Sequence, residues 1–472
     1  MNRSDVSRRG RSLAKVLVLQ LPVLGLMIMT AIYGWYWYHI YYLPRIRYNL
    51  KFYFNGHVVI LLIYFVLLYF FTSTYGGLKV GYLKPTDVIL SQMFSLLGVN
   101  LISYFQLSLM ANWLVAVFPM IRMTLLQLLF AIIFVNFSDA IYKKTFPPKH
   151  LLLVHADRPV RSILGKFALR PDKYEVEKCI DIRDGLEAAQ EEILREKDGS
   201  RVYDGVVIWD VPTQIRNELL KFCFHKSVRM YIMPKIPDVL MHGSAELHLF
   251  DTPIYMTREY ALSFTQRLAK RTIDLVCALI LLIIASPIML ITAAAIHFYD
   301  KGPVFYKQTR CTLNEKPFQI IKFRSMRVDA EKDGVARLAS QNDDRITPCG
   351  RFIRKVRIDE LPQLINVLKG EMSFIGPRPE RPEIIAQYVK EMPEFVYRMK
   401  VKAGLAGYAQ VYGKYNTTPY DKLKLDLTYI QNYSVWLDIK LILLTLKILL
   451  KPESTEGVTE GQTTALDNNE DR

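Results

Sequence analysis

The chain has 472 residues, of which 51% are hydrophobic, and 61 Lys and Arg against 45 Asp and Glu give a formal charge of +16. This length predicts two to four domains. The hydrophobic residues lie in long blocks flanked by basic residues, which indicates a membrane protein and argues against nucleic-acid binding. The five cysteines are scattered without a CxxC pair, which argues against a disulfide framework or a zinc site.

Residues 1–145 predict four transmembrane helices. Apolar runs long enough, or nearly long enough, to cross a bilayer lie at residues 17–38, 55–73, 86–109 and 120–140. The first run ends in a cluster of Tyr and Trp that is typical of a membrane interface. Lys and Arg concentrate before the first run and after the second and fourth, so the positive-inside rule places the N-terminus and residue 146 in the cytosol.

Residues 146–257 predict a soluble α/β domain. Short apolar runs alternate there with helical patterns, which is the βαβα order of a parallel sheet. After the first run, at residues 151–154, the chain reads His-Ala-Asp-Arg in place of the GxGxxG motif of dinucleotide-binding folds. We therefore expect a Rossmann-like domain with a structural or regulatory role and without a nucleotide-binding glycine motif.

A further apolar run, residues 272–298, opens the basic segment 258–452. Ser286-Pro287 interrupts this run, and proline kinks a helix. Because both flanks are basic, we expect the run to enter the membrane and return to the cytosolic side as a re-entrant helix. The alternative is a kinked but complete span. The acidic tail, residues 453–472, predicts disorder.

The stretch from Cys349 to Pro379 holds the most informative motif. Asp359 and Glu360 precede an apolar run and a glycine, which predicts a short helix over residues 361–369. Arg357 lies just before the acids and Arg378 shortly after the helix. Two carboxylates between arginines suggest phosphoryl chemistry, with one acid holding a metal ion and the other acting as a nucleophile. The alternative is an ordinary helix start whose acids cap the helix.

Two pairs of residues are further candidates for substrate binding. Lys322 and Arg324 alternate along a strand-like run, so their side chains would point the same way, toward a phosphate. Asp426 and Tyr429 would share one face of a helix near the C-terminus, where a solvated helix face is an equally good interpretation.

Five ordered segments resemble a known family. They read KRTID (270–274), GPVFYKQTR (302–310), KPFQIIKFRSM (316–326), RIDELPQLINVLKGEMSFIGPRP (357–379) and GLAGYAQVYGKYN (404–416). In order and spacing they resemble the bacterial sugar transferases, which are polyisoprenyl-phosphate hexose-1-phosphate transferases of the large monotopic phosphoglycosyl transferase type, such as undecaprenyl-phosphate glucose or galactose phosphotransferases. The expected fold is then a four-helix transmembrane region, a Rossmann-like α/β domain and a mixed α/β catalytic domain with a re-entrant membrane helix.

This resemblance implies a reaction and roles for three residues. Asp359 matches the nucleophile that attacks the β-phosphate of a UDP-hexose and releases UMP, leaving a sugar-phosphoryl-aspartyl intermediate. Undecaprenyl phosphate then accepts the sugar phosphate. Glu360 matches the acid that holds Mg²⁺, and Arg378 matches an arginine near the phosphates.

The resemblance also implies a setting for this reaction. It would be the first membrane step of exopolysaccharide, capsule or O-antigen biosynthesis. The chain would be a multi-pass protein of the bacterial cytoplasmic membrane, and its catalytic domain would contact the lipid bilayer and face the cytoplasm. A homodimer is one expected oligomeric state. The family usually has glycines where residues 311–316 read CTLNEK, and Pro and Thr where this chain has Ala403 and Ala406. These departures leave the choice of sugar open.

Two other functions compete with this interpretation. A membrane-anchored nucleotide-sugar dehydratase would need GxGxxG and a Tyr-xxx-Lys pair beside a nucleotide site, and those glycines are missing. A non-catalytic scaffold of a polysaccharide assembly complex would have lost the acid pair or the arginines, and all of them are present.

Overall fold

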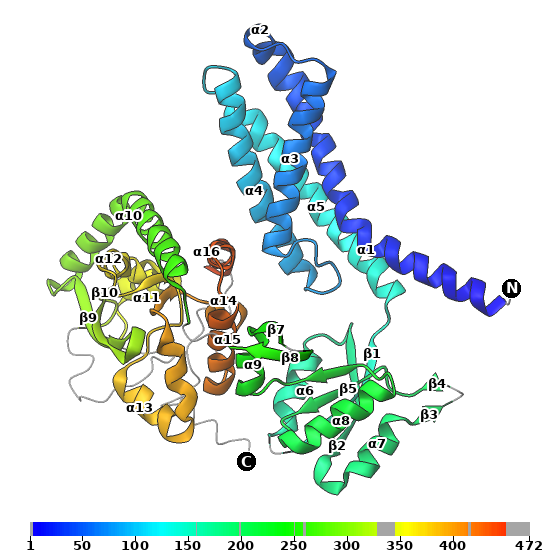
Figure 1. Cartoon of the computed structure of the whole chain (residues 1–472). Coiled ribbons are helices and arrows are strands. Elements are labelled where there is room, and N and C mark those ends of the chain that lie inside the picture. Colours follow the sequence, from blue (N-terminus) through cyan, green and yellow to red (C-terminus); the bar gives the residue numbers. More distant parts are fainter. Residues whose placement is uncertain are drawn as a thin grey trace. The chain divides into compact units, whose positions relative to one another are not determined.

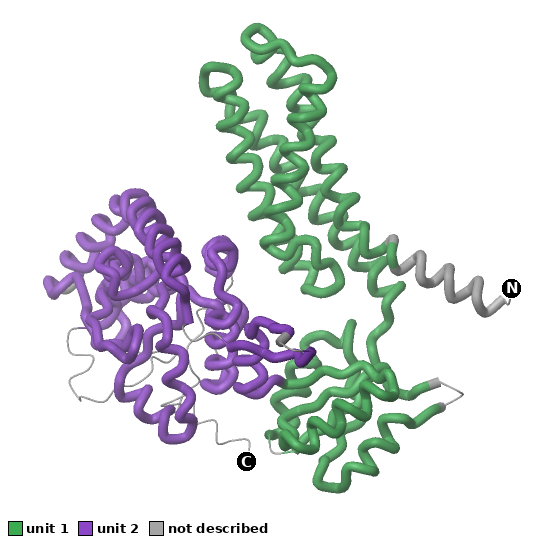
Figure 2. The backbone as a smooth tube through the Cα atoms, viewed as in Figure 1, with its two compact units in different colours: residues 1–233 green, residues 234–472 purple. Residues whose placement is uncertain are grey.

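The computed structural model describes residues 3–156, 158–197, 200–249, 251–257, 261–327, 345–413 and 417–449. The chain forms two compact units, residues 1–233 and 234–472, which Figure 2 shows in different colours. We expected a domain limit after residue 257, whereas the contacts group the residues after 233 with the second unit. The tail predicted to be disordered, residues 453–472, lies outside the described residues.

The first unit begins with long apolar helices. They are α1 (Arg3–Tyr36), which continues through the π-helical segment η1 (Trp37–Ile46) into α2 (Arg47–Asn49), and then α3 (Phe54–Tyr75), α4 (Pro85–Met110) and α5 (Val117–Thr145). Helices therefore lie at all four places where apolar runs predict them. Together with α10 (Phe264–Asp300) of the second unit, the described part of the chain has five helical segments long and apolar enough to cross a membrane.

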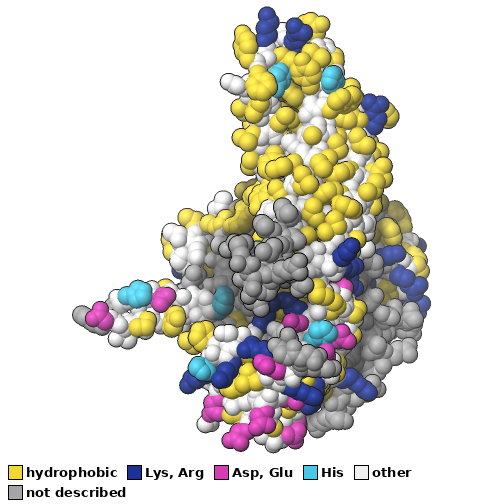
Figure 3. Space-filling view, turned by 90° about the vertical axis from the view of Figure 1, so that its right-hand side faces the viewer, with side chains coloured by type: hydrophobic (Ala, Val, Ile, Leu, Met, Phe, Trp, Pro, Cys, Tyr) yellow, Lys and Arg dark blue, Asp and Glu magenta, His cyan; other side chains and the backbone are white. Residues whose placement is uncertain are grey.

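These helices bury polar side chains between them. Gln127 donates hydrogen bonds to the Tyr64 hydroxyl (2.9 Å) and to the Met29 carbonyl (3.0 Å), and Asn100 donates to Thr124 Oγ1 (2.8 Å). Bonds of this kind hold helices together where water cannot satisfy the same groups. Figure 3 shows hydrophobic side chains covering the outside of the bundle, while charged side chains gather on the α/β part. This distribution is typical of helices that face lipid.

A parallel sheet forms the rest of the first unit. Its strands lie in the order β2-β1-β5-β6, with bounds β1 (Lys149–His155), β2 (Tyr174–Asp181), β5 (Gly205–Trp209) and β6 (Met230–Ile232). The other elements are α6 (Val160–Ala168), η2 (Ile182–Asp184), α7 (Leu186–Ile193), β3 (Glu196–Lys197), β4 (Ser200–Arg201) and α8 (Thr213–His225). The predicted parallel α/β sheet is confirmed. Strand β5 is buried along its whole length, which explains its continuous apolar run.

The second unit contains α10 and a set of shorter elements. In chain order these are α9 (Ile236–His242), β7 (Ala245–Leu249), β8 (Thr252–Met256), β9 (Phe305–Cys311), η3 (Leu313–Glu315), β10 (Pro317–Phe323), α11 (Pro348–Lys355), η4 (Ile358–Glu360), α12 (Gln363–Lys369), β11 (Ser373–Ile375), α13 (Pro382–Glu391), η5 (Pro393–Lys400), β12 (Gly404–Ala406), α14 (Tyr408–Tyr412), α15 (Pro419–Gln431) and α16 (Val435–Leu449). Strands β9 and β10 pair antiparallel, as do β7 and β8, and β11 pairs parallel with β12.

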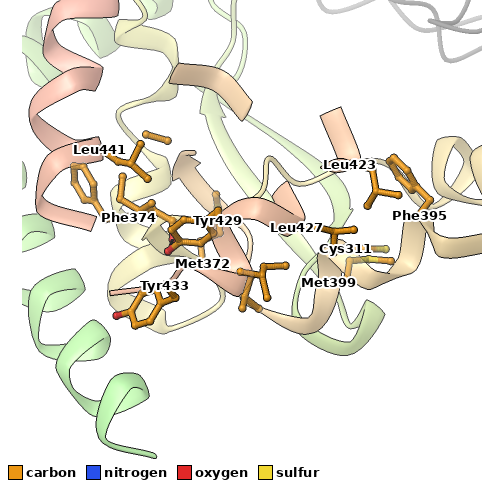
Figure 4. Packing of buried hydrophobic residues seen from close by; sticks show 14 of the residues in the cluster. Cys311, Met372, Phe374, Phe395, Met399, Leu423, Leu427, Tyr429, Tyr433 and Leu441 are labelled. Atoms are coloured by element: carbon orange, nitrogen blue, oxygen red, sulfur yellow. Dashed lines mark hydrogen bonds between the residues drawn. The ribbon is translucent and has the colours of Figure 1, made fainter. Parts of the chain in front are cut away.

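One large hydrophobic core joins these elements. Figure 4 shows Phe374 of β11 close to Leu441 of α16 and Tyr429 of α15. Ile236 and Val239 of α9 belong to the same core. Burial of apolar surface therefore ties the segment that follows residue 233 to the second unit.

Both ends of α10 pack against the second unit. Near its start, Lys270 donates a hydrogen bond to the Ile375 carbonyl (2.7 Å). Near its end, Ile296 is buried against Phe323 and Ile353. A straight helix of this length would measure about 55 Å, but Figure 1 shows α10 bent into two arms. The bend brings the two ends back to the same body.

Candidate active site

The predicted acid pair lies in a 3₁₀ turn between two short helices. Asp359 and Glu360 end η4, which follows α11 and precedes α12. Arg357, just before the turn, has a φ of +57°, a left-handed conformation that is uncommon for a residue with a side chain. Gly370 ends α12 with a φ of +84°, as its sequence predicts. The helix itself begins at Gln363, two residues later than predicted, because the acids occupy a separate turn.

Three cations surround Glu360. Its Oε1 accepts a hydrogen bond from Arg378 Nη2 at 2.7 Å and lies 3.4 Å from Lys322 Nζ, and its Oε2 lies 3.9 Å from Arg357 Nη1. Burial opposes ionisation, but these three cations lower the pKa of Glu360 well below its usual range. Glu360 is therefore a carboxylate that its neighbours hold in place.

Asp359 has different surroundings from its neighbour. No hydrogen bond or ion pair to its carboxyl group is found among the described residues. Burial and the negative charge of Glu360 raise the pKa of Asp359 to about 6. One acid is thus anchored and ionised, and the other is unattached and more basic. Such a division of two carboxyl groups is typical of sites where the acids have separate chemical roles.

Strand β10 brings Lys322 to the acids. Asn366 of α12 links the helix to this strand. The Asn366 side chain accepts a hydrogen bond from Ile321 N (3.0 Å) and donates one to the Gln319 carbonyl (2.8 Å). Asn366 is fully buried. No local pattern in the sequence gives Asn366 a role, although its place in the longest family-like segment, 357–379, is a signal for one. The structure places Lys322 beside Glu360, while its predicted role toward a phosphate stays a prediction.

The loop that carries Arg378 has no regular structure, yet four consecutive carbonyls in it are hydrogen-bonded. The carbonyls of residues 377–380 accept, in order, from Gly404 N (2.9 Å), Arg398 Nη2 (3.0 Å), Arg310 Nη1 (3.2 Å) and Cys311 N (3.1 Å). Gly404 is required there, because a Cβ built on it would lie 2.0 Å from Gly376 N. Backbone groups, the buried Arg398 and the half-buried Arg310 together fix the position of Arg378.

Asp426 neutralises one of these arginines. Its Oδ2 lies 2.8 Å from Arg398 Nη2, and Glu380 lies 3.7 Å from Arg398 and 3.6 Å from Arg310. Asp426 is 1% exposed and Arg398 3% exposed. The alternative of a solvated helix face is therefore wrong for Asp426, which contacts the support of the Arg378 loop. No local sequence pattern marks Arg398 as a functional residue.

Tyr429 is also buried, and its partners are Lys270 and Asp438. Lys270 Nζ lies 3.1 Å from the Tyr429 hydroxyl and 2.8 Å from Asp438 Oδ2, and the hydroxyl donates to Asp438 Oδ1 at 2.7 Å. A solvated position is wrong for Tyr429 as well. The cluster links α10 to α15 and α16.

The remaining predicted residues lie away from these contacts. Arg324 follows β10, is 7% exposed, and packs so closely against Gly302 that a Cβ there would be 2.4 Å from its Nη1. Ser286 and Pro287 lie within α10, where Ser286 Oγ donates to the Ile283 carbonyl at 2.8 Å. The helix is continuous through Pro287, and Figure 1 shows that α10 as a whole is bent.

The acid pair has the donor type that Mg²⁺ requires. Magnesium binds through one or two carboxylates, with substrate phosphates and water completing its ligands. Asp359 and Glu360 supply two adjacent carboxyl groups, one unattached and one ionised. In the part of the chain that the structure describes, no group of three or more His, Cys, Asp and Glu side chains is arranged so that it could hold a metal ion. The residues therefore fit a metal bound jointly with substrate and do not fit a closed protein cage.

Comparison with known proteins matches this part of the chain. A family model described as bacterial sugar transferase covers residues 265–452. A protein of Caulobacter vibrioides named UDP-glucose:undecaprenyl-phosphate glucose-1-phosphate transferase is 40% identical over 192 residues, which are 40% of this chain and 72% of that relative. The chain belongs to the bacterial sugar transferase family. All the contacts of Asp359 and Glu360 described above lie inside the region that matches the family.

Two other members of the sugar transferase family are similar over smaller shares of their length. The Escherichia coli (strain K12) UDP-glucose:undecaprenyl-phosphate glucose-1-phosphate transferase is 41% identical over 210 residues, 43% of each chain. An Aeromonas hydrophila UDP-N-acetylgalactosamine-undecaprenyl-phosphate N-acetylgalactosaminephosphotransferase is 36% identical over 266 residues, 53% of this chain and 60% of the relative. The match thus spans about half the length of these two relatives. Their names include different sugars.

Proposed function

We propose that this protein transfers a sugar 1-phosphate from a UDP-hexose to undecaprenyl phosphate and releases UMP. The observation that carries the proposal is the contrast within the acid pair: Glu360 is held by three cations, while Asp359 is unattached and has a raised pKa. An unattached, basic carboxylate beside fixed positive charges suits nucleophilic attack on a phosphoryl group. The names of the relatives support the same donor and acceptor classes.

In the first step, an Asp359 carboxylate oxygen attacks the β-phosphorus of the UDP-hexose. The bond between that phosphorus and the bridging oxygen breaks, and UMP leaves with the electron pair. The sugar phosphate stays on Asp359 as an acyl phosphate. Arg378 and Lys322 lie beside Glu360 and would face the negative charge that develops on the phosphoryl oxygens.

In the second step, a phosphate oxygen of undecaprenyl phosphate attacks the same phosphorus. The bond to Asp359 breaks, and the carboxylate is regenerated. When bound, Mg²⁺ would neutralise charge on the phosphoryl oxygens of the substrate, with Glu360 as the protein group that holds it. Glu360 keeps its ionised form throughout, because the surrounding cations favour it.

The setting we propose is the cytoplasmic face of the bacterial inner membrane, with α1–α5 forming four spans and α10 re-entering. Two observations support re-entry: the ends of α10 pack against one compact unit, and its middle exposes apolar side chains. Ile283, Ile284 and Ile291 are 65%, 67% and 70% exposed. Basic flanks on both sides also favour keeping both ends in the cytosol. In this proposed setting Asp359 would face the compartment where UDP-hexoses are made.

Single-cysteine labelling tests the re-entry. Cysteines are introduced at Leu268 and Pro303, on either side of the apolar part of α10, in a protein whose five native cysteines are replaced. A membrane-impermeant maleimide should label neither position in intact cells and both in inverted vesicles. Labelling of position 303 alone from outside would mean that α10 crosses the membrane.

UMP release from a panel of UDP-sugars tests the reaction and identifies the sugar. The wild-type protein should release UMP in a burst without acceptor and continuously with undecaprenyl phosphate. Asp359→Asn keeps the shape of the side chain but removes its charge, so we expect UMP release to fall by at least about a thousandfold. Asp359→Asn turnover near the wild-type rate would remove Asp359 as the nucleophile. The exposed Glu383→Gln on α13 is the matched control.

A homodimer is a further part of the proposal. Every residue of β8 is exposed, and this strand pairs only with β7 among the described strands. Isolated two-stranded hairpins are marginally stable in water, and Ile254 and Tyr255 leave apolar surface uncovered. Light scattering in detergent should report a dimer for the wild type and a monomer for Ile254→Glu. A monomeric wild-type protein would contradict the proposed homodimer.

A further inference from the structure

Helix α11 presents an exposed face that the reaction described above does not use. Phe352 is 63% exposed and Val356, the residue that ends the helix, is 45% exposed. Residues four apart on a helix lie on the same face, so these two form one apolar stripe. Arg351 and Lys355 are exposed as well and form a basic stripe beside it. A contiguous exposed apolar stripe bordered by basic side chains is the kind of surface that binds a membrane or an apolar ligand.

The position of α11 indicates what that neighbour is. The buried side chain of the helix, Ile353, packs against Ile296 in the second arm of α10. That arm exposes large apolar residues of its own, with Leu290 and Phe298 at 72% and 81% exposure. Ile353 thus packs α11 against the arm of α10 that we assign to lipid. At a membrane surface, basic side chains beside an apolar stripe suit headgroup phosphates.

The same helix leads directly to the nucleophile. Only Arg357 and Ile358 separate Val356 from Asp359, and Ile358 is packed in the cluster that holds Ile353. Lys355 is four residues before Asp359 in the sequence, so a phosphate at this end of the basic stripe would lie beside the turn that carries the acid pair, with its hydrocarbon along the apolar stripe.

We infer that the exposed face of α11 is the docking surface for the lipid acceptor: Arg351 and Lys355 attract the phosphate of a polyprenyl phosphate, and Phe352 and Val356 contact its first isoprene units. The charge of the surface is complementary to a phosphate monoester, and its apolar stripe suits a branched hydrocarbon chain. The inference rests on the proposed two-step reaction. It assigns this face to the second step alone, because the UDP-hexose carries no hydrocarbon.

The two half-reactions separate this inference from the proposed function. Full-length protein in phosphatidylcholine nanodiscs is first mixed with UDP-hexose alone, and the UMP burst is measured. Undecaprenyl phosphate is then added over a range of concentrations, and discharge of the intermediate is followed. In Arg351→Glu/Lys355→Glu and in Phe352→Ser, the burst should stay within about twofold of wild type. The undecaprenyl phosphate concentration for half-maximal discharge should rise by about tenfold or more.

Several outcomes would overturn the inference. Lys390→Glu/Lys400→Glu changes two exposed basic residues on α13 and η5 and is the matched control for net charge; equal slowing of discharge in this control would mean that bulk charge is responsible. Unchanged discharge in all α11 variants would remove the surface from acceptor binding. An effect seen only when phosphatidylglycerol is included would assign the face to bulk anionic lipid. Absence of the burst in wild-type protein would overturn the proposed function and this inference with it.

Discussion

At the scale of single residues, the acid pair shows how two neighbouring carboxyl groups acquire different properties. Glu360 lies within 4 Å of three cationic groups, whereas Asp359 has none that close among the described residues. Folding therefore stabilises the ionised form of Glu360 and destabilises that of Asp359. Burying the unpaired carboxylate of Asp359 lowers the stability of the folded protein. Such a loss of stability is expected for a nucleophile, which must stay unpaired to react, and is not expected for a residue that only caps a helix.

This loss of stability gives a prediction about its dependence on pH. The pKa of Asp359 is about 6 in the folded protein against a usual value of 3.8, so its ionisation destabilises the folded state as pH rises from about 4 through 6. Asp359→Asn should therefore be more stable than wild type at pH 8, by up to about 3 kcal/mol, with the gain vanishing near pH 4. Thermal unfolding in detergent at the two pH values measures it. A variant less stable than wild type at pH 8 would contradict the raised pKa.

Glu360 leads to a prediction about magnesium. Glu360→Ala removes an oxygen ligand and also leaves Arg378, Lys322 and Arg357 without their shared counter-charge. We expect UMP release to fall by at least about a hundredfold and its Mg²⁺ dependence to flatten, because hard cations need oxygen ligands. Titration of UMP release with MgCl₂ measures both effects. Normal activity with a normal Mg²⁺ titration would exclude Glu360 from the metal site.

At the scale of secondary-structure elements, the loop after β11 depends on side chains from distant parts of the chain. Arg398 of η5 reaches the Arg378 carbonyl at 3.0 Å while Asp426 of α15 lies 2.8 Å from the same guanidinium nitrogen. The planar guanidinium of Arg398 has several N–H donors in a fixed geometry, so it can contact both the Arg378 carbonyl and the Asp426 carboxylate. A lysine ammonium on a flexible side chain is a poor replacement for it. The elements that surround the loop therefore act as its scaffold.

Arg398→Lys tests this scaffold. The variant keeps the charge beside Asp426 but loses the fixed geometry, so we expect UMP release to slow by about 10- to 100-fold, with KM for the UDP-hexose little changed. Arg398→Met would instead leave Asp426 uncompensated and should destabilise the fold by about 3–5 kcal/mol. Single-turnover UMP release and thermal unfolding measure the two effects. Lys400→Met, which removes an exposed charge from the same element, should change neither.

The helices and strands themselves were more predictable from the sequence than the contacts between them. Proline and glycine bound α12, and apolar periodicity marks β1, β5 and α5, because these signals act within a few residues. Asp426 and Tyr429 occupy the helix expected from their spacing, but their burial depends on Arg398 and Lys270, which lie 28 and 159 positions away in the sequence. The acids could be found from a motif. The charged groups behind them could not, because contacts between distant segments leave no local pattern.

At the scale of the whole molecule, the limit between the two compact units makes a prediction about truncation. Ile236 and Val239 of α9 are buried in the core of the second unit, and a Cβ built on Gly243 would lie 2.8 Å from the Gln431 carbonyl of α15. A cut after residue 257 removes these contacts, although all the family-like motifs lie beyond it. A cut after residue 233 keeps them.

A fragment of residues 234–472 should therefore fold, bind membranes and release UMP in a burst, since it retains the acid pair, α10 and the complete core. A fragment of residues 258–472 keeps the same site but loses two buried aliphatic side chains, each worth about 1.5–3 kcal/mol, so it should unfold at a lower temperature and yield less active protein. Thermal unfolding and UMP burst amplitude of both fragments measure the difference. Equal stability of the two would show that α9 adds nothing to this core. A folded, membrane-bound but inactive 234–472 fragment would show instead that residues 1–233 contribute to the chemistry.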